Sequence, residues 1–212
     1  MIILTVAGKA DSRVVVYPAA FMLKNYGRVA IVSDDDAYRR LYHGFEDVGE
    51  VDGVSIAVLP RLEPELMADE VQRFNPDFLI CVTNGYVPEF TTHLLVLTGY
   101  DRSFDGGNAH SKEEMEQGVD VNLTDIDKVT VPARIPLENV RELLVSTTPI
   151  KSKTQLSVCL KEGLLMYAAR CEEYKKLLRH DSRDFVGILM KLFCPFILPD
   201  VSAVPQLFGF KK

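Results

Sequence analysis

A glycine and a basic residue follow the first apolar run of the chain. This turn is the part of the sequence that most clearly indicates a ligand-binding site. The turn at 8–13 lies between the apolar run 2–7 and a stretch at 14–24 with helical spacing. A strand, a glycine-containing turn and a helix commonly bind phosphate, because backbone N–H groups and the helix dipole face the anion. We therefore expect a phosphate- or nucleotide-binding site lined by Gly8, Lys9, Asp11, Ser12 and Arg13.

This turn lacks much of a complete phosphate-binding loop. It holds one glycine, and the motif with two glycines followed by Lys and Ser or Thr is missing. An ordinary strand-to-helix turn with a surface lysine explains Gly8 and Lys9 equally well. Arg13 could replace a phosphate-binding lysine, but an arginine in a first helical turn is more often solvated. Both alternatives stay open.

Polar residues also follow two later apolar runs. Asp34 and Asp35 come after the run 28–33, and Asn84 comes after the run 77–83. Ligands of α/β sheets bind at the carboxyl ends of strands, where these acids would suit a metal or a ribose. The alternative, which we favour, is that they cap a helix and interact with its dipole. The four histidines show no ligand spacing, and we assign no metal site.

Apolar runs alternate with helical patterns through the first hundred residues. Buried-strand patterns are followed by amphipathic ones, which predicts a three-layer α/β fold with a mostly parallel sheet and helices on both faces. Pro18 would kink or shorten the first helix. The expected strands are 2–7, 28–33, 54–59, 77–83, 93–98 and 128–133, and the expected helices are 14–24, 38–42 and 64–74.

The second half of the chain has a different pattern. Residues 101–127 are acidic and aperiodic, which indicates an exposed loop with one short helix at 111–117, although such a surface could also dock a basic partner. Residues 154–179 have the longest helical pattern, and 185–193 are apolar on nearly every face. An apolar helix of this kind needs cover. We predict an α/β core at 1–150 and C-terminal helices at 151–212 that pack on the core or form a homodimer.

The composition limits the classes of partner that the protein is expected to bind. Thirty acidic and twenty-four basic residues give a net charge of -6, which disfavours nucleic acid and limits membrane contact to a peripheral one. No apolar run approaches the ~20 residues of a membrane-spanning helix. The apolar start has no basic stretch before it, so we expect a cytoplasmic protein without a signal peptide. Cys81 lies within a buried-strand pattern and is expected to be an inert core thiol.

The beginning of the chain resembles a known family. Residues 6–9 (Val-Ala-Gly-Lys), a predicted helix, residues 26–32 (Tyr-Gly-Arg-Val-Ala-Ile-Val) and the acids at 34–36 are similar to the opening of MinD/ParA-type ATPases, which are P-loop proteins of the SIMIBI class. The resemblance covers most of the first hundred residues. It implies a P-loop NTPase-like fold, and it places Lys9 at the signature lysine that reaches the partner's nucleotide in the dimer.

The chain differs from this family at the positions that carry the family's catalytic and metal-binding residues. Arg13 and Val14 occupy the places nearest to the later catalytic lysine, and the magnesium-binding hydroxyl falls near Val15. Ser33 stands where the first aspartate of the second-strand pair is expected, and Asn84 closes the strand that ends in the family's metal-site aspartate. Phosphoryl transfer depends on these charges, so their loss predicts a catalytically weak or inactive protein.

The resemblance extends to degenerate relatives of the TadZ/CpaE type, which mark where bacterial pili are assembled. It implies a localisation or assembly factor that binds a protein partner and itself. No cofactor is assigned with certainty, and ATP or ADP is the candidate. Two alternatives remain open. One is an active enzyme on a Rossmann-like sheet, although the GxGxxG fingerprint is absent. The other is a nucleotide switch that binds but barely hydrolyses.

Overall fold

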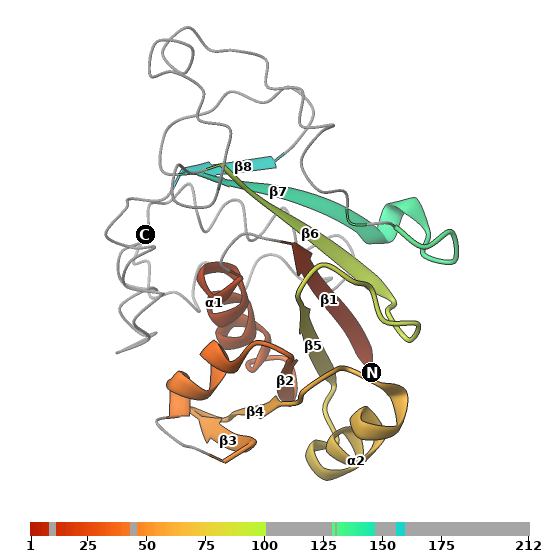
Figure 1. The fold of residues 1–212 in the computed structure, drawn as a ribbon. Helices are drawn as coiled ribbons and strands as arrows, with labels where there is room; N and C mark the ends of the chain where they lie inside the picture. Colours follow the sequence, from red (N-terminus) through yellow and green to blue (C-terminus); the bar gives the residue numbers. More distant parts are fainter. Residues whose placement is uncertain (9–11, 43–45, 101–128, 130, 147–155, 160–212) are drawn as a thin grey trace, which may run out of the picture.

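A single eight-stranded sheet organises the described part of the chain (Figure 1). The computed structural model describes residues 1–8, 12–42, 46–100, 129, 131–146 and 156–159. The strand order is β3-β4-β2-β5-β1-β6-β7-β8, and the only antiparallel pair in it is β3 with β4. The strands are β1 (Ile2–Gly8), β2 (Val29–Ser33), β3 (Val48–Val51), β4 (Val54–Val58), β5 (Phe78–Thr83), β6 (His93–Tyr100), β7 (Val140–Ser146) and β8 (Leu156–Cys159).

Helices cover both faces of this sheet. Helix α1 (Arg13–Leu23) and the 3-10 helix η1 (Asp36–Tyr42) lie on one face, and α2 (Pro64–Phe74) lies on the other. A further 3-10 turn, η3 (Leu137–Asn139), leads into β7. The predicted three-layer α/β architecture with a mostly parallel sheet is therefore confirmed. Pro18 lies within α1 without ending it.

The core is divided by the alternation of side chains along each strand. Val6, Ile31 and Ile80 pack on the α1 face, whereas Val32 and Cys81 pack on the α2 face. A strand that is buried on both faces must be apolar throughout, which explains the continuous runs in the sequence. The same alternation decides which face each polar side chain at the strand ends will point toward.

Strand β3 was not among the predicted strands. Strand β3 pairs with β4 through a tight turn in which Asp52 and Gly53 have φ angles of 49° and 79°. Asp-Gly with two positive φ values is the pair that a two-residue hairpin turn favours. This Asp-Gly pair was the signal in the sequence for a hairpin. The strand before it is short and half-exposed, so it has no apolar run by which it could be predicted.

Two predictions beyond residue 100 are wrong. Residues 129 and 131–133 form no strand, since Pro132 has no N–H to offer a sheet, and β7 takes that place instead. The helix expected from residue 154 is wrong at Leu156–Cys159, which pair with β7 as strand β8. Apolar and small polar residues alternate in these four positions, which is a strand pattern.

The sheet thus continues past residue 150. The predicted helices at 111–117 and 185–193, the remainder of the helix predicted at 154–179 and the segment 160–212 lie outside the described residues. Among the helices that the structure describes, none has the length and apolar character needed to cross a membrane.

Candidate functional site

The chain leaves β1 and β5 in opposite directions across the sheet. Strand β1 leads through α1 to β2 on one side, and β5 leads to β6 on the other side of β1. Strands β1 and β5 are direct neighbours. In open α/β sheets, a ligand binds outside the carboxyl ends of strands at such a topological switch point. The ends of β1, β5 and β2 therefore define the candidate site (Figure 1).

Strand register brings three of the predicted residues to this edge. Ala7 pairs with Thr83, and Ser33 pairs with Val82 on the other side of the same strand. Gly8, Asp34 and Asn84 each lie at or just beyond these paired positions. Lys9 and Asp11 lie outside the described residues.

Gly8 is explained by contact within the sheet. Its φ is +145°, and a Cβ at this position would lie 1.9 Å from the carbonyl oxygen of Leu97 on β6. Only glycine accommodates both the backbone conformation and this close approach. The geometry thus favours the structural alternative for Gly8.

Ser12 is engaged by a tyrosine that the sequence analysis did not single out. Its hydroxyl shares a 2.8 Å hydrogen bond with that of Tyr38 on η1, and the Tyr38 ring packs edge-on against Tyr17, with centroids 5.5 Å apart. Ser12 therefore makes no side-chain capping bond to α1, and the first turn of that helix contains no acidic residue.

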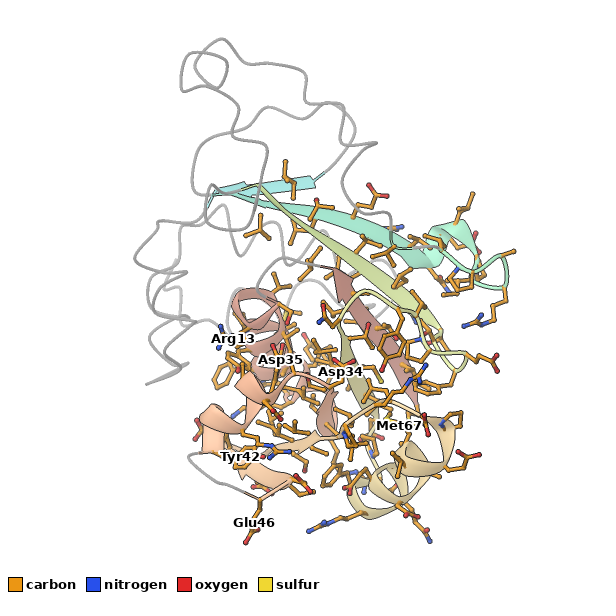
Figure 2. The ribbon with its side chains drawn as sticks, viewed as in Figure 1. Arg13, Asp34, Asp35, Tyr42, Glu46 and Met67 are labelled. Carbon is orange, nitrogen blue, oxygen red and sulfur yellow. The ribbon has the colours of Figure 1, made fainter. Side chains whose placement is uncertain are left out.

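The structure does not agree with the alternative in which the Arg13 side chain is solvated. The residue is only 8 % exposed although it stands in the first turn of α1. A buried guanidinium is retained where acceptors or anions balance its charge, because desolvation is otherwise costly. Figure 2 shows Arg13 toward the same end of the sheet as Asp34 and Asp35.

Asp35 acts as a cap. Its Oδ1 accepts a 2.8 Å hydrogen bond from the backbone N–H of Ala37, and its own N–H donates to the Ser33 hydroxyl at 3.0 Å. These contacts lie at the start of η1 and occupy one oxygen of the Asp35 carboxylate. The capping alternative therefore holds for Asp35.

Asp34 has a different environment. It lies two residues after Val32, directly beyond the end of β2 and on the α2 face, and the Tyr86 hydroxyl and the Asn84 backbone are the polar groups that favour its charged form. Its Oδ1 is buried and has no hydrogen-bond partner in the part of the chain that the structure describes. Burial raises the pKa of the Asp34 carboxyl, and these two polar groups oppose this shift.

Tyr86 holds this carboxylate in place. Its hydroxyl accepts a 3.0 Å hydrogen bond from the Leu62 backbone N–H, and its carbonyl accepts one from the Thr83 hydroxyl. Burial raises the pKa of the Tyr86 phenol, which keeps the proton that it donates to Asp34. Tyr86 was not among the predicted site residues, because it lies in a connection with no motif.

The site residues thus form two groups on opposite faces of the sheet. Ser12 and Arg13 belong to the α1 face, and Asp34 with Tyr86 belongs to the α2 face. No group of three His, Cys, Asp or Glu side chains suited to a metal occurs among the described residues. Cys81 lies in the core, where burial raises the pKa of its thiol, as expected for an inert cysteine.

The strand order also bears on the choice between fold classes. Strand β5 separates β1 from β2, whereas these first two strands are neighbours in the usual dinucleotide-binding sheet. The chain is therefore a doubly wound, mostly parallel α/β protein whose order differs from that sheet. The alternative of an enzyme on a Rossmann-like sheet gains no support from it.

Comparison with known proteins gives limited similarity. No protein-family model and no curated protein matches the chain. It is similar to the structure of LpxK from Aquifex aeolicus in complex with ATP, with a TM-score of 0.35 and 14% identity, over 74% of this chain and 53% of that one. It is also similar to molybdopterin-guanine biosynthesis protein B, with a TM-score of 0.30 and 16% identity, over 84% of this chain and 100% of that one.

The chain spans about half the length of LpxK. At TM-scores this low, the two likenesses carry no argument about activity or ligand. The architecture described above rests on the sheet of this chain.

Proposed function

We propose that this protein binds a nucleotide at the carboxyl edge of β1, β5 and β2, hydrolyses it slowly or not at all, and acts through contacts with a protein partner. The observation that carries this proposal is a buried arginine in the first turn of α1, beside the topological switch point of the sheet. Sites of this kind are where α/β proteins bind phosphate-bearing ligands.

The first turn of α1 has the electrostatics of an anion site. Its dipole is opposed neither by an acidic side chain nor by a capping bond from Ser12. The partial positive charge at a helix N-terminus attracts anions, and a guanidinium binds phosphate through a planar fork of donors. Arg13 is therefore the residue that we assign to the phosphates.

Slow or absent hydrolysis follows from what the turn lacks. A catalytic lysine and a metal-binding hydroxyl have no counterparts near Val14 and Val15. Each such electrostatic contribution is typically worth about 3 kcal/mol of transition-state stabilisation. A site that keeps a phosphate contact without them binds more readily than it catalyses.

A role in localisation or assembly is the biological form that we propose. The resemblance to degenerate MinD/ParA-type proteins supports it, together with the apolar residues 185–198, whose side chains need cover from the core or from another chain. The net charge of -6 favours a protein partner over nucleic acid.

Calorimetric titration with ADP and with ATP plus magnesium tests the binding step. We expect wild-type protein to bind both, and Arg13→Gln to weaken binding about ten- to a hundredfold, as for loss of a hydrogen bond to a charged group. Arg13→Lys keeps the charge and should recover part of the affinity. The matched control is Arg73→Gln, since Arg73 is exposed near the end of α2.

Phosphate release measured on the same samples tests the catalytic step. The proposal expects bound ATP to remain intact over many binding lifetimes. Rapid turnover by wild-type protein would contradict the proposed lack of hydrolysis, and failure of both nucleotides to bind would contradict the proposal as a whole.

A further inference from the structure

One carboxylate oxygen at the candidate site has an unsatisfied hydrogen-bonding capacity. Oδ1 of Asp34 is buried without a hydrogen-bond partner in the described residues, although the Tyr86 hydroxyl and the Asn84 backbone are near enough to lower the pKa of the same carboxyl. Buried polar atoms are almost always paired, and an orphan among them calls for a missing donor such as a water or a ligand group.

We propose that Asp34, positioned by Tyr86, is a specificity-determining residue that accepts a hydrogen bond from a sugar hydroxyl of the bound nucleotide. This inference rests on the proposed function and deepens it, because it assigns a second subsite on the α2 face of the sheet. Tyr86 acts through Asp34 and is a positioning residue.

Spacing across the sheet supports a ligand that reaches both subsites. Strand β5 lies between β1 and β2, and neighbouring strands are about 4.8 Å apart, so the ends of β1 and β2 are separated by roughly 10 Å. A nucleoside diphosphate extends over such a distance from its terminal phosphate to its sugar. Its phosphates would lie at the first turn of α1, and its sugar would lie across the strand ends beside Asp34.

The donor set around Asp34 favours a neutral hydroxyl over a cation. The neighbours that favour the charged carboxylate are hydrogen-bond donors, the Tyr86 hydroxyl and the Asn84 backbone, and the Leu62 N–H donates to Tyr86. In the described residues no group of three potential metal ligands surrounds this carboxylate. A hydroxyl group supplies one hydrogen-bond donor to the one unpaired oxygen of Asp34. Unlike a cation, it needs no further anionic ligands.

The turn that follows β5 is open on its outer side. Gly85 lies between the two donors with φ at +90°, and no heavy atom lies within 4 Å of the position that a Cβ would occupy there. Residues 84 and 85 are exposed.

Affinities for ADP and 2′,3′-dideoxy-ADP, measured by calorimetry, test this assignment. Wild-type protein should bind ADP about tenfold more tightly, because a hydrogen bond to a buried charged acceptor is lost in the analogue. Asp34→Asn should weaken ADP binding and leave dideoxy-ADP binding unchanged, which removes the discrimination. Tyr86→Phe should reduce the discrimination, and the control Asp69→Asn, on the exposed surface of α2, should retain it.

The outcomes separate the two proposals. Equal binding of the two nucleotides by wild-type protein, or a full preference for ADP in folded Asp34→Asn, overturns the sugar subsite and leaves the proposed function standing. Binding of neither nucleotide overturns both. The wild-type comparison alone decides the matter if a variant fails to fold.

Discussion

At the scale of single residues, Asp34 and Asp35 show how neighbours in sequence acquire different roles. Asp35 closes a cap with Ala37, whereas Asp34 turns to the other face and keeps one oxygen unpaired. Two adjacent residues at a strand end point to opposite sides, so the pair could not act as one ligand set. The sequence shows two adjacent acids, but it does not show which of them caps the 3-10 helix.

The raised pKa of Asp34 predicts a pH-dependent stability. Because the folded carboxyl binds its proton more tightly than the unfolded one, the contribution of Asp34 to stability is greatest at low pH and declines as pH rises past 3.8, the ordinary value. Asp34→Asn should therefore be at least as stable as wild type at pH 7, with the advantage fading toward pH 3. Denaturant unfolding at several pH values measures the difference.

Asp77 provides a control of opposite sign. A backbone hydrogen bond from Arg28 lowers the pKa of its carboxyl, so its contribution to stability is present above the ordinary value and disappears as pH falls through the lowered one. Asp77→Asn should destabilise the protein at pH 7 and have little effect at low pH. Parallel pH profiles for the two variants would contradict both assignments.

At the scale of elements, the apolar runs predicted most strands because buried parallel strands leave little room for polar residues. Strands β3 and β7 could not be predicted in this way. Glu50 in the first and Arg141 with Glu142 in the second interrupt the apolar pattern, and both strands depend on their neighbours for pairing. Tyr86 and Tyr38 were missed for a related reason, since their partners lie far away in sequence.

The contact between β1 and β6 predicts the effect of a change at Gly8. Gly8→Ala would place a methyl group against the Leu97 carbonyl in a backbone conformation that alanine rarely adopts, and we expect a loss of more than about 2 kcal/mol. Gly85→Ala is the matched control, because its φ is also positive but the space around it is open. Urea unfolding midpoints of the two variants measure the loss of stability at each position. An equal loss of stability at both positions would contradict the steric explanation.

At the scale of the whole molecule, the sheet and the candidate site belong together. The switch point arises from the order of strands, so the location of the site could be inferred once the elements were known. Sequence reasoning placed Gly8, Asp34 and Asn84 at the carboxyl ends of separate predicted strands, and the strand order brings these ends together. The division of the site between two faces requires the actual pairing and could not be predicted.

Self-association is the prediction that concerns the whole chain. If the apolar residues 185–198 form an interface, light scattering of the full-length protein should give a mass of twice 23.8 kDa. A nucleotide that strengthens this contact should lower the concentration at which the dimer forms. A monomer at all concentrations, with and without ADP, would contradict a homodimer.

The central claim is that a nucleotide binds at the carboxyl edge between the first turn of α1 and the end of β2. A crystal structure of the full chain grown with ADP tests it most directly. The account predicts phosphates at the guanidinium of Arg13 and a sugar hydroxyl at Oδ1 of Asp34. ADP bound at any other surface, with this edge unchanged, would contradict it.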